Sequence, residues 1–575
     1  MKIKKPIALL LSLVSACSLF ACGGGGANGK KLTLEVCGFD GGIGNEWLFA
    51  MEEEFEEKFA NTQYGKYTGV NLEISQKQGL TDTNILADAY AVYFADRADI
   101  PLFAALGSAF DITDIVMEED ENGRTIDSLM TDHVKSRFLI DGKYYGLPHY
   151  ESFGGVSYDV ETFDKNLAYF ADTTSGYNGP QDYNYYNTKF GTGVFIANEE
   201  STRSCGPDGV FDTFDDGLPT SLVEMLILCD YLKENGVSPF VLSGQWKNME
   251  VVMSIGLFAA LAGYDALQTC YSFDGEIEAI KLDANGNYIF TNEPLFPGVD
   301  GIYKPETEKV QITQANGHRT TDMVEKYYSF AFTQVAMQEG FFDSSSLVST
   351  VSHTDAQSNV IFGSKAKGQN DKGMLIDSNF WWNESKMAGN FDAYALTTNS
   401  DQERIIRYMS LPTSLDTTTT EGNGEPITLL DGAHGNMYVN NNIKNKPELI
   451  AAVRDFIQLA YSDAKLREFT VITGMTRPLD YTLTEEDKTQ LDGWGNHFLH
   501  LHEVGNVLNY GGDNDLVRKY YAAFRICMSA LRWKNTWDGK AYSNAYQAIA
   551  AGSNARTVME TCRIKPDAWG EYYSE

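Results

Sequence analysis

The amino-acid sequence predicts an α/β protein with two lobes. The chain has 575 residues, and single hydrophobic cores stop growing at about 250 to 300 residues, so more than one core is expected. Residues 32–36 alternate as a strand, residues 46–59 carry apolar side chains at helical spacing, and residues 70–75 alternate again. A strand, a helix and a strand at this spacing predict a βαβ unit, whose ligands bind beyond the carboxyl ends of its strands.

The chain begins with an export signal. Three lysines precede an apolar run over residues 7–21, which is too short for a comfortable membrane span. The run ends in Leu-Phe-Ala-Cys, which resembles the lipobox of bacterial lipoproteins. The resemblance implies removal of residues 1–21 as a signal peptide, lipidation of Cys22 and a flexible Gly-rich tether over residues 22–31. An ordinary signal peptide, cut at a small residue, is the alternative.

Further helices are predicted along the chain by apolar periodicity. They cover residues 83–94, 222–235, 322–339, 447–461, 515–532 and 544–551. Two stretches lack this periodicity and are rich in turn-forming residues, which is typical of surface insertions. They are residues 171–217, which are also acidic, and residues 397–428.

Composition excludes several classes of function. The formal net charge is −34, and so acidic a surface repels nucleic acid and anionic lipid, so neither is expected as a partner. Hydrophobic residues make up 43% of the chain and charged residues 22%, which is typical of a globular protein. The six cysteines after Cys22 form no CxxC pair, so thiolate metal sites and thioredoxin-like chemistry find no support, and the disulfide pairing stays open. We expect a monomer that requires no cofactor.

The segment Gly142-Lys-Tyr-Tyr-Gly-Leu-Pro148, followed by Gly155-Val-Ser-Tyr-Asp159, resembles the crossover of family 1 extracellular solute-binding proteins. These are the sugar-binding lipoproteins that feed ABC importers. Other short segments resemble motifs of the family and follow in its order, across almost all of the mature chain. They are residues 222–243, 361–366, 373–382, 408–412 and 474–478.

This resemblance implies a periplasmic-binding-protein-like fold with a ligand cleft between two lobes. It assigns residues 32–152 and 382–461 to the first lobe, and residues 153–381 and 462–575 to the second. It also implies a lipid anchor on the extracellular face of the cytoplasmic membrane, and the capture of a mono- or oligosaccharide for an ABC permease, without catalysis. Two alternatives stay open: a glycoside hydrolase, since 79 acidic residues make carboxylate pairs easy to form, and a surface adhesin that captures glycans without a transporter.

The stretch GMLIDSNFWWN, residues 373–383, combines the two kinds of side chain that a sugar needs. Sugars present C–H patches to flat aromatic rings and hydroxyls to planar polar groups. Three adjacent rings cannot all face one way on a strand, so we expect Trp381 to contact the ligand while Phe380 and Trp382 divide core and cleft between them. The polar candidates beside these rings are Asp377, Asn379 and Glu384.

Other candidate ligand contacts follow from position. Phe39 and Asp40 come directly after the first strand, where an α/β sheet opens its cleft. Tyr150 and Glu151 follow the Leu-Pro crossover, where the chain passes between lobes. Two further candidates are Trp246 and Arg477, for which a plain surface or core role is the alternative.

An acidic, turn-rich loop is a candidate cation site. Its four carboxylates and its glycines suit a hard cation such as Ca²⁺, although the EF-hand spacing is missing. A solvated acidic turn is the alternative. The four residues are Asp208, Asp212, Asp215 and Asp216. Three histidines at 497, 500 and 502 cannot share one face of a helix or strand, so we interpret them as structural or surface residues.

Overall fold

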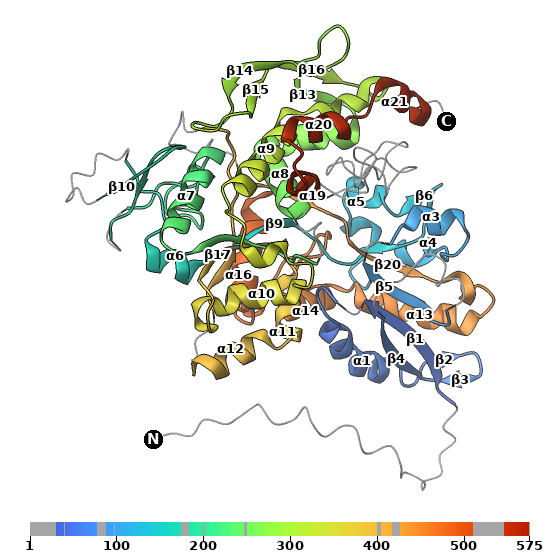
Figure 1. The fold of residues 1–575 in the computed structure, drawn as a ribbon. Coiled ribbons are helices and arrows are strands. Elements are labelled where there is room, and N and C mark those ends of the chain that lie inside the picture. The colour runs from blue at the N-terminus through green and yellow to red at the C-terminus, as the bar shows by residue number, and fades with distance from the viewer. Residues whose placement is uncertain are drawn as a thin grey trace, which may run out of the picture.

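The computed structural model describes most of the chain. The described ranges are residues 30–39, 41–77, 88–96, 98–173, 183–198, 202–245, 250–399, 404–416, 426–509 and 545–573. Several predictions lie outside them: the signal peptide over residues 1–21, Cys22, Asp40, Trp246 and the helix over residues 515–532. Figure 1 shows two α/β lobes, the first on the right in blue and orange and the second on the left in green and yellow.

The first lobe is built on a five-stranded sheet of order β4-β1-β5-β20-β8. β1 lies parallel to both β4 and β5, whereas β20 runs antiparallel to β5 and β8. The helix α1 buries its apolar face beside this sheet, which confirms the predicted βαβ unit. The bounds are β1 Leu32–Phe39, α1 Glu46–Lys58, β4 Val70–Lys77, β5 Val92–Asp96, β8 Leu147–Pro148, β20 Gly435–Val439, α13 Pro447–Ala460 and α14 Asp463–Thr473.

The second lobe is built on a four-stranded sheet of order β12-β17-β9-β18. β12 and β17 are parallel, and β9 runs antiparallel to β17 and β18. The bounds of the strands and main helices are β9 Gly154–Asp159, α6 Val160–Asn166, α7 Leu222–Glu234, β12 Ser238–Val241, α8 Glu250–Ser272, α9 Val324–Gln338, α10 His353–Phe362, β17 Lys372–Ser378, α11 Trp381–Met387, α12 Asn390–Thr398, β18 Ile406–Tyr408 and α16 Gly493–Val504.

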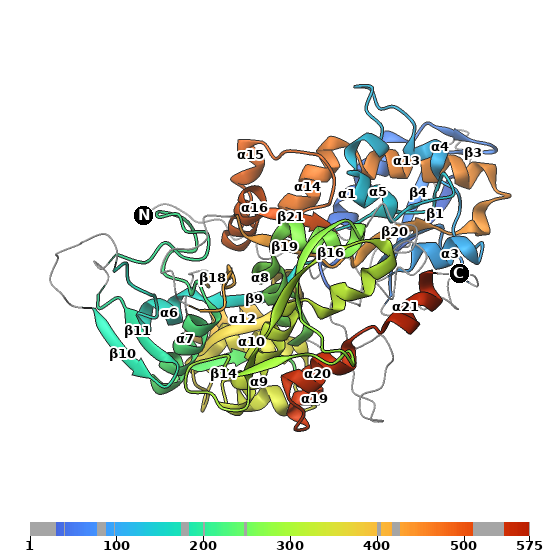
Figure 2. The same ribbon diagram turned by 90° about the horizontal axis from the view of Figure 1, so that it is seen from above.

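Smaller elements decorate both lobes. α19 and α20 lie against α9, as Figure 2 shows from above, and α21 packs on residues 314–322 of the second lobe. The bounds are β2 Gln63–Tyr64, β3 Tyr67–Thr68, α3 Ile100–Ala105, α4 Thr113–Val116, α5 Asp132–Ser136, β6 Leu139–Ile140, β7 Lys143–Tyr144, β10 Asn184–Thr188, β11 Gly191–Phe195, β13 Gly275–Ile280, β14 Phe290–Pro294, β15 Tyr303–Pro305, β16 Thr307–Ile312, β19 Thr428–Asp431, α15 Glu485–Lys488, β21 Asn506–Asn509, α19 Ala545–Ala550, α20 Ala555–Cys562 and α21 Pro566–Tyr573.

Most of the predicted helices that fall in the described ranges are confirmed, and one prediction is wrong. The predicted helices over residues 222–235, 322–339 and 447–461 correspond to α7, α9 and α13. Within the predicted helix over residues 83–94, however, the described part enters β5, an inner strand of the first sheet. A short apolar run fits a buried strand as well as a helix, and here pairing with β1 and β20 decides for the strand.

The structure also differs from the predicted lobe boundaries. Residues 382–399 and 404–408, assigned to the first lobe, contribute to α11, α12 and β18 and pack in the second lobe. Conversely, α14 was assigned to the second lobe, yet its Phe469 ring lies 5.4 Å from the Trp47 ring of α1 in the first lobe's core. The chain therefore returns to the first lobe, and later leaves it again, at higher residue numbers than predicted.

Three crossover segments join the lobes, over residues 149–153, 431–434 and 474–478. The Glu151 amide donates to the Thr476 carbonyl at 3.0 Å, and the Gly432 amide donates to the Ser152 carbonyl at 2.7 Å. These bonds bind the three segments into one strip between the lobes.

Two further observations concern membrane-spanning helices and cysteines. Among the described helices, none has both the length and the apolar character that crossing a membrane requires. The five cysteines of the described ranges are buried. They are Cys37, Cys205, Cys229, Cys270 and Cys562.

Candidate binding site between the lobes

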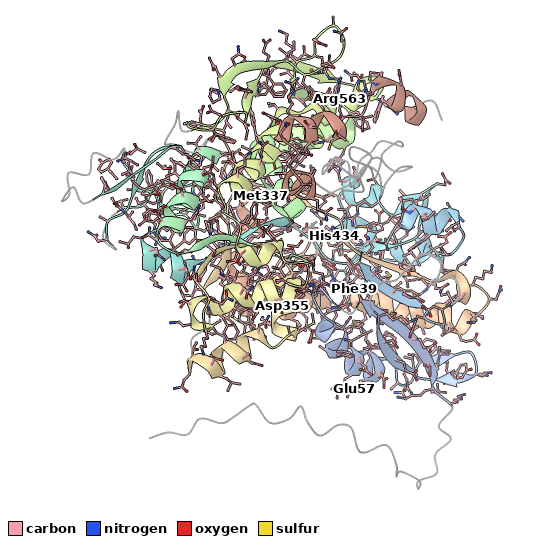
Figure 3. All side chains as sticks on the ribbon, viewed as in Figure 1. Phe39, Glu57, Met337, Asp355, His434 and Arg563 are labelled. Carbon is pink, nitrogen blue, oxygen red and sulfur yellow. The ribbon has the colours of Figure 1, made fainter. Side chains whose placement is uncertain are left out.

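The carboxyl ends of the first-lobe strands face the second lobe. Phe39 ends β1, Asp96 ends β5 and His434 lies just before β20. Figure 3 labels Phe39 and His434, together with Asp355 at the start of α10, in the region where the two lobes meet. We call this meeting surface the front junction. Its members are Phe39, Gly42, Asp96, Tyr150 and His434 from the first lobe and crossovers, and Gln357, Asp377, Phe380 and Glu384 from the second lobe.

Three aromatic rings from both lobes gather at the front junction. The Tyr150 and Phe380 ring centroids lie 6.4 Å apart with the ring planes at 78°. The half-buried Phe39 ring lies over Gly41, where an added Cβ would come within 3.0 Å of it. An added Cβ at Gly42 would lie 3.8 Å from the Tyr150 hydroxyl and 3.9 Å from the Phe39 ring. Glycine at position 41 leaves room for the Phe39 ring, and Gly42 has a φ of +57°, which favours glycine.

A carboxylate of the second lobe reaches the backbone of the first. The Gly42 amide donates to Glu384 Oε1 at 3.2 Å. Behind it, Gln357 Nε2 donates to Glu384 Oε2 at 2.8 Å and to Asp377 Oδ2 at 3.1 Å. Burial raises the pKa of both carboxyl groups, and the Glu384 charge raises that of Asp377 further. Gln357 thus holds two carboxylates in place at the edge of the first lobe.

The ring expected to contact the ligand, Trp381, is buried in the core. Its exposed fraction is 0%, and its Nε1 donates to Ser157 Oγ at 3.0 Å. Trp382 is 2% exposed and stacks on Trp494 at 5.5 Å. Because β17 ends at Ser378 and α11 begins at Trp381, helical geometry turns both tryptophans inward. In this arrangement Phe380, which is half-buried, is the ring of the three that faces the other lobe.

Two other candidates have structural contacts. Asn379 is fully buried, and its Oδ1 accepts from the Phe153 amide at 3.0 Å, which fixes the first crossover. Arg477 is 2% exposed, and its guanidinium lies 4.1 Å from the Phe469 ring centroid. Burial lowers the pKa of this arginine. Both side chains support the lobes from inside rather than facing the front junction.

Glu151 faces the opposite side from Tyr150. Its carboxylate accepts from Asn509 Nδ2 at 2.7 Å and lies 2.8 Å from His502 Nε2. Together with residues 128–131 and 477–480, these side chains line a cavity of about 430 Å³, which we call the rear pocket. No sequence motif pointed to Gln357 or Asn509, and His502 stood out only as one of three clustered histidines.

Comparison with known proteins places the fold. No family model matches the sequence, and no curated protein matches it significantly. Among solved structures, a chitin oligosaccharide binding protein superposes with a TM-score of 0.52 at 12% identity, covering 95% of this chain and 100% of that chain. A structure from work on xylan utilization by the thermophilic bacterium Caldanaerobius polysaccharolyticus superposes with a TM-score of 0.50 at 13% identity. The match covers 92% of this chain and 99% of that chain.

The chain has the two-lobed fold of the solute-binding proteins. The predicted fold class is therefore confirmed. In this solute-binding-protein fold the two lobes are joined by the three crossovers, and the front junction lies between them.

In the acidic loop of this solute-binding-protein fold, several carboxylates accept hydrogen bonds from the loop itself. Asp215 is buried, and its carboxylate accepts from the Asp208 amide at 3.2 Å and from Thr213 Oγ1 at 3.0 Å. Asp216 Oδ2 accepts from the Asp212 amide at 3.0 Å. Across the described ranges, no three His, Cys, Asp or Glu side chains converge as a metal site. Asp208, Asp215 and Asp216 thus stabilise the loop's own turns, and calcium binding by this loop stays a prediction.

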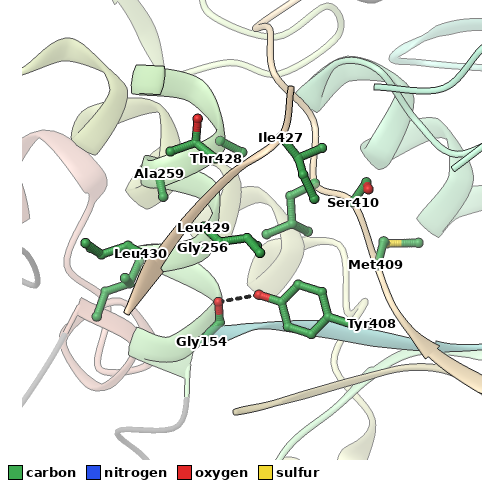
Figure 4. A pocket seen from close by; sticks show the side chains of 13 residues that line it. Gly154, Gly256, Ala259, Tyr408, Met409, Ser410, Ile427, Thr428, Leu429 and Leu430 are labelled. Atoms are coloured by element: carbon green, nitrogen blue, oxygen red, sulfur yellow. Dashed lines mark hydrogen bonds between the residues drawn. The ribbon is translucent and has the colours of Figure 1, made fainter. Parts of the chain in front are cut away.

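A small apolar cavity behind the second sheet is a packing feature. It measures about 20 Å³, which is room for about one water molecule. Tyr408 closes one side by donating its hydroxyl to the Gly154 carbonyl at 2.8 Å, as Figure 4 shows. Such a volume holds no sugar, so this cavity is not a candidate ligand site.

Proposed function

We propose that this protein is a non-catalytic, lipid-anchored solute-binding component of an ABC importer. It captures a mono- or oligosaccharide at the front junction, between its two lobes, and delivers it to a membrane permease. Cys22 anchors the mature chain to the extracellular face of the cytoplasmic membrane through the Gly-rich tether. The ligand shifts the equilibrium between open and closed lobes through its greater affinity for the closed form.

The observation that carries this proposal is the composition of the front junction. Phe39, Tyr150 and Phe380 supply apolar ring surface from both lobes, and Asp96, Glu384 and Gln357 supply planar polar groups beside it. That combination matches the alternating C–H and hydroxyl surface of a sugar. The lipobox at residues 19–22 supports the anchor, and the solute-binding-protein fold supports capture between lobes.

A glycan panel tests the proposal against its two alternatives. The mature chain carrying Cys22→Ser, which prevents lipidation, is titrated with mono- and oligosaccharides by calorimetry, and the solutions are then analysed for products. We expect saturable binding of at least one sugar without turnover. Release of smaller sugars would favour the glycoside hydrolase, and binding without any uptake defect in a deletion strain would favour the adhesin.

A further inference from the structure

One buried network ties all three crossovers to both lobes on the rear side of the strip. We call it the hinge network. Each of the three crossovers contributes one side chain to it. The first lobe adds Arg137, and the second lobe adds two side chains. The full set is Arg137, Glu151, Asp431, Thr476, His502 and Asn509.

Charged groups form the centre of this network. His502 Nε2 lies 2.8 Å from Glu151 Oε2. Asn509 Nδ2 donates to Glu151 Oε1 at 2.7 Å and to Asp431 Oδ2 at 3.4 Å. Arg137 Nη1 lies 3.4 Å from that same Asp431 oxygen. Because Glu151 and Asp431 are 1% and 0% exposed, removing the positive charge beside either one leaves a buried carboxylate without compensation.

The network spans the pivot of any lobe movement. Tyr150 and Ser152 contact groups of the front junction, whereas Glu151 between them faces the rear pocket. This pocket is lined by residues 128–131 of the first lobe and by His502 of the second. Because the crossovers lie between the two sides, a rotation that opens the front junction also moves the second-lobe residues of the rear pocket relative to the crossovers. His502 therefore changes its relation to Glu151 when the lobes move.

We propose that the Glu151–His502 pair is a pH-sensitive latch that holds the lobes in the arrangement seen here while His502 is charged. The proposal rests on the proposed function, because the latch regulates closure of the same site. As His502 loses its proton, the latch weakens, the open form gains population and sugar affinity falls.

The groups that face His502 fix the direction of this effect. Glu151 and Asp431 face it from two crossovers, and Glu503 is its neighbour on α16, where it pairs with Lys488 at 3.2 Å. The Phe153 and His502 ring centroids lie 6.3 Å apart, and Thr476 and Asn509 are neutral. Arg137 is linked to His502 only through Asp431. Carboxylates thus dominate the charge around the imidazole.

The pH window follows from the two members of the pair. Burial opposes the charge on His502, but Glu151, together with Asp431 and Glu503, raises the imidazole pKa above its usual 6.5. Burial likewise opposes the charge on Glu151, but His502 lowers the carboxyl pKa below its usual 4.5. Both charges are therefore present between these two shifted values. The latch is lost as the pH rises through the raised pKa of His502.

The test compares closure and affinity at pH 6 and pH 9 in the Cys22→Ser chain. We expect the sugar found in the panel to bind about three- to tenfold more weakly at pH 9, because a buried, charged hydrogen bond is lost. His502→Gln should remove this difference, since glutamine donates without titrating. His500→Gln is the matched control, because His500 lies on the same helix but is exposed and contacts Phe214. An unchanged pH difference in His502→Gln, or its loss in His434→Gln instead, overturns the latch.

Two measurements separate the latch from the proposed function and from misfolding. Small-angle scattering without sugar should show a larger radius of gyration at pH 9 than at pH 6, and a constant radius contradicts the latch even if sugar binds. If no sugar binds at any pH, the proposed function fails while the scattering result stands. If His502→Gln does not fold, an NMR titration of the wild-type imidazole decides: a pKa above 6.5 supports the latch, and a lower one overturns it.

Discussion

At the scale of single residues, the three rings at 380–382 show how local geometry assigns roles. Phe380 stands between the end of β17 and the start of α11, whereas Trp381 and Trp382 are already helical. The sequence predicted that the rings could not share one face, which the structure bears out. Which ring faces the other lobe depends on Trp494, far along the chain, whose ring lies 5.5 Å from each tryptophan, so local periodicity could not assign it.

Replacing Phe380 by alanine should weaken sugar binding without unfolding the protein. Phe380 is half-buried and lies beside Tyr150 across the junction, so its loss removes a stacking surface worth about 1 kcal/mol or more. Calorimetric titration measures the affinity, and the melting temperature serves as the control for folding. Unchanged affinity would show that the ring does not touch the ligand.

Replacing Trp381 by alanine should instead destabilise the fold. The ring is fully buried and donates to Ser157, so truncation costs about 3 to 5 kcal/mol in the free energy of unfolding. Denaturant titration followed by far-ultraviolet circular dichroism measures the loss. Trp381→Phe is the milder comparison, since it keeps most of the volume. If Trp381→Ala kept the wild-type stability but lost sugar binding, Trp381 would be a ligand contact after all.

At the scale of elements, amphipathic helices were predictable and a buried strand was not. The helix α13 carries its apolar residues on one face, which the sequence displays directly. The strand β5 is buried along nearly all of its length, so it has no polar alternation to distinguish it from a helix. That error also hid Asp96, which ends β5 and accepts from the Tyr150 hydroxyl at 3.4 Å.

The acidic loop gives a prediction at this scale. Burial, with the Asp208 charge, raises the pKa of Asp215 to about 7. A carboxyl whose folded pKa is raised costs stability as the pH rises from its usual 3.8 towards that value. Asp215→Asn should therefore raise the melting temperature more at pH 8 than at pH 5, because asparagine keeps the acceptor and removes the charge. Scanning calorimetry at both values measures this, and an equal change at both would contradict the assigned cause.

At the scale of the whole molecule, the chain length predicts that there are two lobes, but it does not predict where the chain crosses between them. A hydrophobic pattern reports that a segment is buried but not in which core. The predicted lobes of residues 382–399, 404–408 and 463–473 are therefore wrong. α11 packs in the second lobe through Trp494, and α14 packs in the first through Trp47. For the same reason the contact between Gly42 and Glu384 could not be predicted, because these residues come from different lobes.

A crystal structure of the mature chain with its tightest sugar tests the central claim most directly. We predict that the sugar lies between the lobes at the front junction, with one ring face against Phe380 and its hydroxyls near Glu384 and Asp96. Sugar density on an outer surface, away from Phe39, Tyr150 and Phe380, would contradict capture between the lobes.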